Sequence, residues 1–396
     1  MRIAYVCVDP GIPVFGNKGA SIHVRAVLDV LVRAGHEVHL ITPRAGGTVM
    51  AGITLHLLRF AGGTEPAARE LAARETDRTV EQVLNRIRPE LVYERYSLWG
   101  RTATRWAREN SVQSVLEVNA PLPVEHAAHR VLVDPAAAGR VARSALGCAT
   151  AVVCVSDPVA TWVRGVRGAA GLPESSRIGV VPNGVDCRRI VPGERDVRAA
   201  DSAEFVVGFV GTLKPWHGVE VLLDAMALLR RTDPSWRALI VGDGPQAPTL
   251  RLRAQAGDLA GAVEFAGSVE PETVAALLHR MDIATAPYPA GPDSYFSPLK
   301  VYEYLAAGLP VVAGSVGQLP QALDHGELGE LVPAGDAPAL AASLRALRDN
   351  PDRRAELRIR GRRVAQEHHT WEVVVARSLA LLPGGDTMMS AGRGVA

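Results

Sequence analysis

Lysine is scarce in this sequence, and its scarcity marks the positions where it is kept. Of 43 basic residues, only Lys18, Lys214 and Lys300 are lysine. Each lies in a segment marked by Gly or Pro, just after an apolar run that predicts a strand. A compact ammonium and a planar guanidinium are not interchangeable at a binding site. We interpret the three lysines as candidate site residues, with chance as the alternative.

Secretion and membrane signals are also absent. The four cysteines form no C-x-x-C pair, and Cys7 and Cys154 lie inside apolar runs, which predicts reduced packing cysteines in a cytoplasmic protein. The opening apolar run breaks at Asp9-Pro10, so no signal peptide is predicted. The uncharged stretch 304–323 is interrupted by Gly and Pro, which argues against a membrane span and against stable membrane insertion. A net charge of +1 gives no case for nucleic-acid binding.

Several ligand motifs are missing as well. The sequence contains no D-x-D, no H-E-x-x-H and no cysteine cluster with zinc-like spacing, so no metal site is expected. It contains neither G-x-G-x-x-G nor a Walker A loop. The second predicted strand ends at Thr42-Pro43-Arg44, without the acidic residue that holds a ribose in NAD sites. An NAD-dependent oxidoreductase is therefore not predicted.

The sequence does contain a regular alternation of short apolar runs and amphipathic stretches over 396 residues. This alternation predicts α/β structure with doubly wound parallel sheets, and the length favours two domains. We expect one Rossmann-like domain over 1–190 and a second over 200–368, joined by a linker at 182–202. Residues 369–385 are expected to form a helix that returns to the first domain, and 386–396 a disordered tail.

Three segments that follow predicted strands could bind anions. The first, from Pro10 to Ser21, offers Gly16, Lys18 and Gly19 before a helix that Ser21 could cap. A tight turn without a ligand is the alternative. Ligands of doubly wound folds bind at the carboxyl ends of strands, where this segment is expected.

The second segment, from Gly211 to Gly218, reads GTLKPWHG. Lys214 and His217 would lie beside a helix start, a placement that favours phosphate binding. A loop with a solvated lysine is the alternative.

The third segment includes SPLKVYEYLAAG, in which Ser297 and Pro298 read as N-cap and first helical residue. Lys300 then falls in the first turn, where the helix dipole disfavours a cation unless an anion is near. Glu303 lies three residues on, on the same helix face, where its carboxylate could accept two ribose hydroxyls. A surface ion pair between Lys300 and Glu303 is the alternative.

Taken together, these stretches resemble the retaining glycosyltransferase family 4, which has the GT-B fold of two facing Rossmann-like domains. The resemblance rests on the glycine loop, VVPNGVD at 180–186, VGDGP at 241–245, FAGSV at 265–269, SPLKVYEYLAAGLPVVA and the closing TWEVVVARSLALL. It is nearest to a branch with the sequence F-S-P-L-K. It implies retaining, metal-independent transfer from a nucleotide-diphosphate sugar, with UDP or GDP as the nucleotide and no other cofactor.

The resemblance also implies roles for particular residues. Lys214, Lys300 and Asn119 would be catalytic, and Glu94, Arg95, Asn119 and His126 would bind the acceptor. The donor would be bound by Gly16, Lys18, Gly19, Asn183, Thr212, Lys214, His217, Asp243, Ser268, Val269, Tyr295, Phe296, Ser297, Pro298, Leu299, Lys300 and Glu303.

The chain departs from the family pattern at three places. Tyr295 replaces the first glutamate of the Glu-x7-Glu pattern. Thr212 and His217 stand where an arginine and a lysine usually bind phosphate, and Asn119 stands where a histidine is frequent.

The acceptor has no signature, but the loops at 93–97 and 119–129 carry polar and charged side chains. These suit a polar small molecule, such as a natural product or small metabolite, better than a lipid. Transfer to a cell-surface glycan or glycolipid is the second reading. A sugar-nucleotide epimerase, a non-catalytic nucleotide-sugar binder and a homodimeric assembly stay open.

Overall fold

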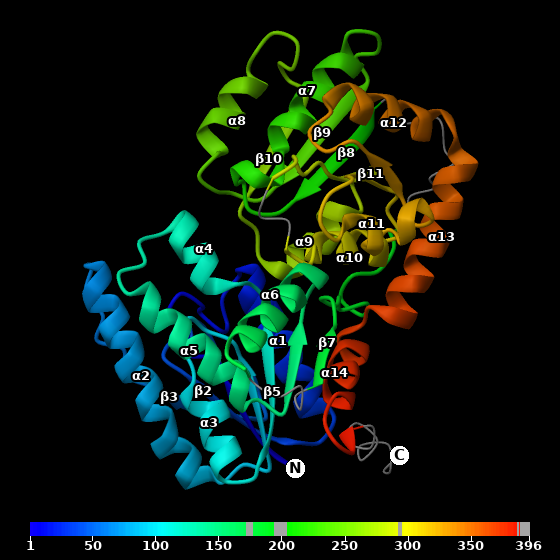
Figure 1. Ribbon diagram of the computed structural model, residues 1–396. Coiled ribbons are helices and arrows are strands. Elements are labelled where there is room, and N and C mark those ends of the chain that lie inside the picture. Colours follow the sequence, from blue (N-terminus) through cyan, green and yellow to red (C-terminus); the bar gives the residue numbers. More distant parts are fainter. Residues whose placement is uncertain (172–176, 194–203, 292–294, 386–387, 389–396) are drawn as a thin grey trace. The chain divides into compact units, whose positions relative to one another are not determined.

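The computed structural model describes residues 1–171, 177–193, 204–291, 295–385 and 388, which belong to two compact units (Figure 1). Unit 1 comprises Met1–Asn183, Tyr295–Ser297 and Trp371–Ala396. Unit 2 comprises Gly184–Ser294 and Pro298–Thr370. The alternation of strands and helices in both units confirms the predicted α/β class.

Unit 1 contains a seven-stranded sheet in the order β3-β2-β1-β4-β5-β6-β7, and every neighbouring pair is parallel. The sheet order reverses between β1 and β4, which creates a topological switch point where ligands of such folds bind. The strands are β1 (Arg2–Val6), β2 (Glu37–Thr42), β3 (Ile53–Leu57), β4 (Leu91–Arg95), β5 (Gln113–Val118), β6 (Ala151–Cys154) and β7 (Arg177–Val180).

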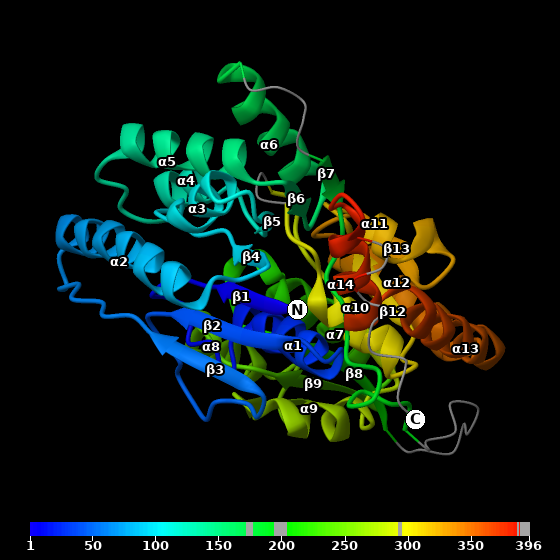
Figure 2. The ribbon, with the colours of Figure 1, turned by 90° about the horizontal axis from the view of Figure 1, so that it is seen from below.

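Helices cover both faces of this sheet. In Figure 2, α2, α3 and α5 lie on one side of the strands and α1 on the other. The helices are α1 (Gly19–Arg33), α2 (Pro66–Ile87), α3 (Thr102–Glu109), α4 (Leu122–His129), α5 (Pro135–Cys148), α6 (Asp157–Ala169) and α14 (Trp371–Ala380).

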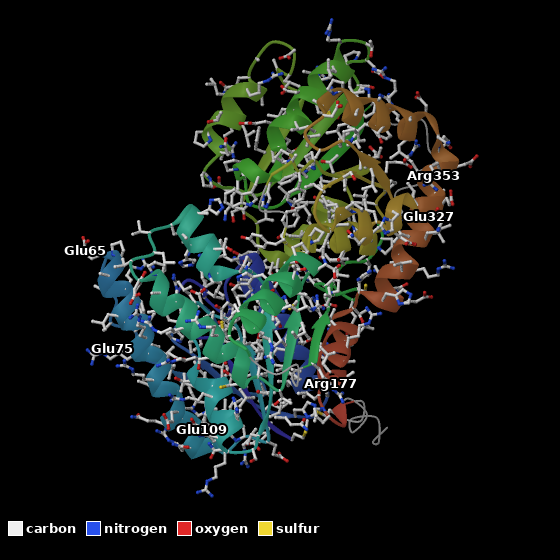
Figure 3. All side chains as sticks on the ribbon, in the orientation of Figure 1. Glu65, Glu75, Glu109, Arg177, Glu327 and Arg353 are labelled. Atoms are coloured by element: carbon white, nitrogen blue, oxygen red, sulfur yellow. The ribbon has the colours of Figure 1, made fainter. Side chains whose placement is uncertain are left out.

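Burial on both faces explains the sequence pattern of the strands. In β1, the residues from Ile3 to Val6 are all buried, so the strand reads as a continuous apolar run and does not alternate. On α2, Val80 and Leu84 face the sheet, whereas Glu75, and Glu65 just before the helix, point away from it (Figure 3). Truncating a buried leucine such as Leu84 to alanine would cost about 2–5 kcal/mol of stability.

Unit 2 contains a six-stranded parallel sheet in the order β10-β9-β8-β11-β12-β13. Its order reverses between β8 and β11, which gives a second switch point. The strands are β8 (Phe205–Val210), β9 (Trp236–Val241), β10 (Val263–Gly267), β11 (Ile283–Ala286), β12 (Val311–Gly314) and β13 (Glu330–Val332).

The helices of unit 2 place apolar faces on this sheet. On α7, Leu222, Leu223 and Met226 are fully buried in one cluster with Phe209 of β8 and Ile240 of β9. The helices are α7 (Val219–Arg230), α8 (Ala247–Ala254), α9 (Pro271–Leu278), α10 (Leu299–Ala306), α11 (Leu319–Ala322), α12 (Ala337–Asp349) and α13 (Pro351–His368), with short 3-10 turns at Pro215–His217 and Asp324–Gly326.

Two of the helix starts predicted from sequence were wrong. Ser21 lies inside α1, which begins at Gly19, and its hydroxyl donates to Pro13 O at 2.6 Å. Helix α10 begins at Leu299, so Pro298 precedes the helix and Ser297 does not cap it. In both cases the serine hydroxyl is used in a tertiary contact, which local cap rules do not see.

Some predicted features lie outside what the structure describes. The expected disordered tail at 386–396 falls almost entirely there, as do parts of the linker at 182–202. Within the part of the chain that is described, no helix has the length and apolar content needed to cross a membrane.

Candidate functional site

The carboxyl ends of β8 and β9 in unit 2 are brought together by glycines. Gly211 follows β8 with φ 145°, and Gly242 follows β9 with φ 135°. A Cβ on Gly242 would lie 2.0 Å from Gly211 O, and one on Gly244 would lie 2.5 Å from Leu213 O. The two loops therefore approach backbone to backbone, and Leu213 N donates to Asp243 O at 3.0 Å.

Lys300 is the central cation of this region. It lies in the first turn of α10 and is 8% exposed, and its Nζ has no hydrogen-bond partner among the described residues. The Nζ lies 4.1 Å from the ring centroid of Phe209 and 4.9 Å from that of Tyr288. A Cβ on Gly211 would come within 2.9 Å of it. The glycine and the two rings thus form a cradle for this ammonium.

Burial lowers the pKa of Lys300 to about 7, and the nearby Glu303 opposes the shift only in part. A buried cation without a partner is costly, and a bound anion would restore the charged form. Sequence reasoning singled out Lys300, but it missed Phe209 of β8 and Tyr288 just after β11, because aromatic residues in or next to strands look like core residues.

His217 does not supply a second cation. Its Nδ1 lies in hydrogen-bond contact with Thr212 O. Burial, helped by Lys300 and Lys214, lowers the pKa of His217 to about 3, so the ring is neutral near pH 7. Lys214 lies with its Nζ 4.7 Å from the ring centroid of the exposed Trp216. Of the two residues in this loop, Lys214 is the one that carries charge.

Glu303 pairs with an arginine that sequence reasoning did not consider. Arg189 Nη2 donates to Glu303 Oε1 at 3.0 Å, and Arg189 Nη1 donates to Pro271 O at 2.6 Å. Burial raises the pKa of the Glu303 carboxyl, while Arg189 and Lys300 act in the opposite direction. Among the described residues, Lys300 and Glu303 form no ion pair. The alternative of a Lys300–Glu303 pair was therefore wrong, because Glu303 pairs with Arg189 instead.

Other residues predicted to bind the donor occupy strand ends of the same unit. Thr212 and Asp243 are exposed in the loops after β8 and β9, and exposed Ser268 and half-buried Val269 follow β10. Pro298 and Leu299 begin the segment that enters α10. The structure brings the loops after β8 and β9 together through the backbone contacts described above, and the role of each residue stays a prediction.

The predicted glycine loop of unit 1 is packed and folded on itself. Gly16 N donates to Pro13 O at 2.9 Å, and the exposed Lys18 donates through Nζ to Gly11 O at 3.2 Å. Gly19 opens α1. A Cβ on Gly47, in the loop after β2, would lie 2.5 Å from Phe15 O, so this loop also approaches closely.

Tyr295, Phe296 and Ser297 belong to unit 1 although unit 2 surrounds them in sequence. Asn183 N donates to Ser297 Oγ at 3.0 Å, and Asn183 Nδ2 donates to Ser297 O at 3.0 Å. Tyr295 OH donates to Glu125 of α4 at 2.8 Å, and Ser156 Oγ donates to Tyr295 O at 2.5 Å. Tyr295 stands where the family pattern has its first glutamate. Its hydroxyl is hydrogen-bonded to Glu125, which lies in the predicted acceptor region.

A buried polar network lies at the carboxyl ends of β4 and β5. Glu117 accepts from Arg95 Nη1 at 3.0 Å and from Tyr93 OH at 3.1 Å, and it also accepts from Asn119 Nδ2. His23 Nε2 lies 2.8 Å from Glu117 Oε1. Burial alone would raise the pKa of Glu117, but His23, Arg95 and Asn119 outweigh it and lower this pKa to about 2.

The network also reaches the points where the chain leaves unit 1. His23 Nδ1 lies 2.8 Å from Asn183 Oδ1, and the ring of Trp371 packs edge-on against His23 at 4.7 Å between centroids. Arg95 and Asn119 are thus tied to a buried carboxylate in a shared network. Sequence reasoning missed His23 and Glu117, since His23 lies on an apolar helix face and Glu117 in an apolar strand.

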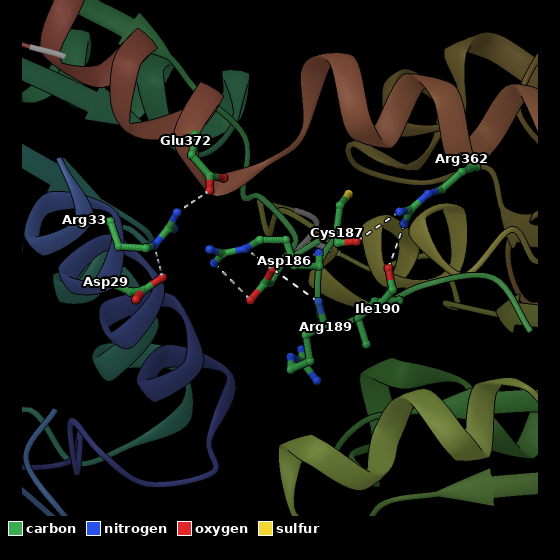
Figure 4. A network of polar contacts seen from close by, with 9 residues as sticks. Asp29, Arg33, Asp186, Cys187, Arg189, Ile190, Arg362 and Glu372 are labelled. Carbon is green, nitrogen blue, oxygen red and sulfur yellow. Dashed lines mark hydrogen bonds and ion pairs between the residues drawn. The ribbon is translucent and has the colours of Figure 1, made fainter. Parts of the chain in front are cut away.

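Polar contacts fix the neighbouring chain segments within each unit (Figure 4). In unit 1, Arg33 of α1 donates to Asp29 at 2.8 Å and to Glu372 of α14 at 2.9 Å. In unit 2, Arg362 of α13 donates to Ile190 O at 2.7 Å and to Cys187 O at 3.0 Å. The segments after Asn183 and before Trp371 are therefore anchored by arginines.

Unit 1 also contains a pocket of about 330 Å³ at the switch point of its sheet. It is open to one side and includes the predicted acceptor residue His126, whose pKa is lowered by burial and by Arg130. The lining residues are Val8, Asp9, Pro10, Gly11, Thr64, Pro66, Arg69, Glu70, Ala73, Ser97, Leu98, Trp99, His126, Arg130 and Val131. Glu94, predicted to touch the acceptor, is fully buried and not among them.

Comparison with known proteins shows what each half of the chain is similar to. Residues 17–189 match the model of Glycosyltransferase Family 4, and residues 204–350 match that of Glycosyl transferases group 1. Each half of the chain is therefore similar to a glycosyltransferase domain. This supports the family predicted from the sequence, whereas the F-S-P-L-K branch stays a prediction.

Individual relatives cover only part of this chain. It is 31% identical over 226 residues to the phosphatidyl-myo-inositol mannosyltransferase of Mycobacterium leprae, covering 57% of this chain and 56% of that protein. It is 35% identical over 211 residues to the D-inositol 3-phosphate glycosyltransferase of Rhodococcus opacus, covering 50% and 46%. The chain spans about half the length of the curated relatives it matches.

The fold is GT-B. Anabaena Alr3699/HepE, solved in complex with UDP and glucose, superposes with a TM-score of 0.71 at 20% identity, over 96% of this chain and 100% of that one. The two parallel α/β sheets described above are the two domains of that fold. In the described parts of the chain, no group of three or more His, Cys, Asp or Glu side chains is arranged to hold a metal ion.

Proposed function

We propose that this protein is a retaining, metal-independent glycosyltransferase that moves a sugar from UDP- or GDP-sugar to a polar small-molecule acceptor. The observation that carries the proposal is the ammonium of Lys300, which is buried and without a hydrogen-bond partner among the described residues at the switch point of unit 2. A diphosphate leaving group would supply the missing anion. The solved relative with UDP supports the nucleotide class.

The chemistry at this site is electrostatic. As the sugar–phosphate bond breaks, negative charge grows on the diphosphate, and a cation already in place stabilises that transition state without reorganisation. Lys300 and Lys214 would supply the charge, while neutral His217 offers its other ring nitrogen as a hydrogen-bonding group. Glu303 would accept the ribose hydroxyls, as the family resemblance implies.

The donor is tested by thermal shift with UDP, GDP, ADP and NAD. We expect one diphosphate to stabilise the protein in a concentration-dependent way and NAD to have no effect. The absence of any shift with all three diphosphates would remove the proposal. A donor screen read by mass spectrometry then identifies the sugar, and incubation without acceptor distinguishes epimerisation from transfer.

Metal independence is tested with EDTA. We expect full activity in the chelator, because the sequence has no D-x-D carboxylates to clamp a divalent ion on the diphosphate. Activity that disappears in EDTA and returns with Mg²⁺ or Mn²⁺ would overturn this part of the proposal.

The acceptor is proposed from the unit 1 pocket. A volume of about 330 Å³ lined by Asp9, Arg69, His126 and Arg130 fits a polar small molecule. A lipid-linked or glycan acceptor is the second candidate, favoured by the name of the phosphatidyl-myo-inositol mannosyltransferase relative. Comparing transfer to water-soluble polyols with transfer to vesicle-borne lipid separates the two.

A further inference from the structure

The unit 1 pocket has an unpaired hydroxyl in its wall. Ser97 follows β4, lines the pocket and is 4% exposed. Its Oγ has no hydrogen-bond partner among the described residues. A buried polar atom without a partner is costly, so such a group on a pocket-lining residue indicates a ligand that satisfies it.

A second unpaired group lies behind Ser97. Glu94 is fully buried at the end of β4, and neither carboxyl oxygen has a hydrogen-bond partner in the part of the chain that is described. The nearest acid, Asp77 of α2, is already bonded by Thr102 Oγ1 at 2.6 Å and by the amides of Arg101 and Thr102, each at 3.2 Å. Asp77 therefore has donors of its own, and its negative charge disfavours an ionised Glu94.

Gly100 shows that these two groups converge. A Cβ at this position would lie 2.4 Å from Ser97 Oγ and 2.9 Å from Glu94 Oε1, with Val8 Cγ2 at 3.3 Å. The serine hydroxyl and the carboxyl thus border the same small space, which exists only because residue 100 has no side chain. Glu94, Ser97 and Gly100, which belong to one short segment, therefore form a small polar site beside the pocket.

The carboxyl is a proton donor near neutral pH. Burial, reinforced by the charge of Asp77, raises the pKa of Glu94 to about 8, while the Thr104 backbone acts weakly in the opposite direction. Among the described residues the two groups are not hydrogen-bonded to each other. A neutral carboxyl has an O–H to give to Ser97 Oγ across the space at Gly100, which would leave the serine O–H free to donate into the pocket. An oxygen of an uncharged hydroxyl is the complement of that donor.

We propose that Ser97 binds a hydroxyl group of a polyol or sugar acceptor in the unit 1 pocket, and that Glu94 acts through Ser97 as its positioning residue. This inference rests on the proposed function, since it names the chemistry of the acceptor. Gly100 provides the space that both groups share. Arg69 and Arg130, which also line the pocket, contact other parts of the same ligand.

Binding is measured on the full chain by saturation-transfer NMR and thermal shift, with myo-inositol, D-glucose and glycerol as probes. At least one probe is expected to bind the wild type. Ser97→Ala is expected to weaken that probe about tenfold, as for a lost hydrogen bond, and Gly100→Ala to abolish binding by filling the shared space. The matched control is Ser114→Ala. Ser114 is a buried serine near the start of β5, and its Oγ accepts from Thr150 N at 3.1 Å. This substitution should lower stability and leave probe affinity unchanged.

Substitutions of Glu94 distinguish a positioning role from a purely structural one, because the two roles predict different changes in melting temperature and probe affinity. Glu94→Leu removes an unpaired buried carboxyl, so the melting temperature should rise while probe affinity falls. Glu94→Gln keeps a donor in the same place and should retain the affinity. Stability and affinity that move together in Glu94→Leu would overturn the positioning role.

Two results overturn the proposal itself, namely no probe binding to the wild type or unchanged affinity in Ser97→Ala. Binding of UDP and GDP is measured in the same samples. If neither nucleotide binds while a polyol does, the proposed function fails and the pocket assignment stands. If a nucleotide binds and no polyol does, only the pocket assignment fails.

Discussion

At the scale of single residues, Lys300 shows how a fold can place a buried amine where an anionic ligand would bind. Its ammonium lies over the rings of Phe209 and Tyr288 and next to a glycine, with no hydrogen-bond acceptor in the part of the chain that the structure describes. Aromatic faces tolerate a cation but do not replace a counter-ion. The residue therefore favours states in which an anion is bound.

We predict that Lys214→Ala and Lys300→Ala each lower kcat by about ten- to a thousandfold, the range for losing one donor to a developing charge. Lys→Arg should restore activity only in part, because the guanidinium fork is larger and the cradle at Gly211 is tight. Lys18→Ala, in the glycine loop of unit 1, should have a smaller effect on nucleotide binding. Steady-state kinetics at saturating donor test this, and arginine variants with wild-type rates would refute the lysine argument.

The pKa of Lys300 gives a pH dependence. With a value of about 7 in the free protein, Lys300 is largely neutral above that pH and must take up a proton when a diphosphate binds. Nucleotide affinity should therefore fall as the pH rises above about 7, by at most about tenfold per unit. Calorimetry in buffers of different ionisation enthalpy measures the uptake. Identical uptake in Lys300→Met would assign the proton to another group.

At the scale of elements, hydrogen bonds near both ends of α10 fix its position. Tyr304 OH accepts from Val210 N at 2.8 Å and ties the helix to the end of β8, which sets Lys300 at the strand ends. Before the helix, Ser297 is bonded to Asn183 in unit 1. The first turn is therefore positioned by tertiary bonds and not by a local cap.

Glu303 on α10 gives the third prediction. Glu303→Ala should lower nucleotide affinity about ten- to a hundredfold, if the carboxylate accepts ribose hydroxyls. It also leaves Arg189 without its carboxylate, so stability should fall slightly as well. Arg189→Ala is the control, because it breaks the same ion pair without removing the carboxylate. If Glu303→Ala and Arg189→Ala both bind nucleotide as tightly as the wild type, the ion pair has only a structural role.

The buried network between β4 and β5 gives the fourth prediction. The pKa of Glu117 is lowered to about 2, so its stabilising contribution is fully present above about pH 4.5 and is lost as the pH falls through 2. Glu117→Gln should lower the free energy of unfolding at pH 7 by about 3–5 kcal/mol, since it leaves buried Arg95 without a counter-ion. Urea unfolding across this pH range measures it, with exposed Glu65→Gln as control. A variant as stable as the wild type at pH 7 would contradict it.

At the scale of the whole molecule, the chain leaves unit 1 after Asn183 and after Ser297, and it re-enters the unit at Tyr295 and at Trp371. Within unit 1, Asn183 and Trp371 both contact His23, and Asn183 also holds Ser297. The points of crossing are therefore anchored to one buried polar network.

The reaction outcome is the fifth prediction and belongs to the complete chain. We expect an α-linked donor to yield an α-linked product, as the family resemblance implies. Proton NMR of the product, read before mutarotation or with a non-reducing linkage, gives the anomeric configuration. An inverted product would refute retention.

The sequence by itself determined the α/β class, the two sheets and the three lysine-bearing segments. These follow from local chemistry, since apolar runs of strand length alternate with amphipathic helices and glycines mark the turns that approach a ligand. It also pointed to Lys300, because a cation in a first helical turn conflicts with the helix dipole. Each of these signals lies within about ten residues of chain.

Only the tertiary structure decided which distant residues meet. It gave Glu303 its partner Arg189, 114 residues away, and made His217 neutral through burial beside two lysines. In the folded chain, Ser297 Oγ accepts a hydrogen bond from Asn183 N and does not cap a helix. Glu94 and Ser97 come together at the space beside Gly100. Partners, burial and pKa depend on the low-dielectric surroundings that packing creates, and those surroundings are assembled from segments that no local pattern connects.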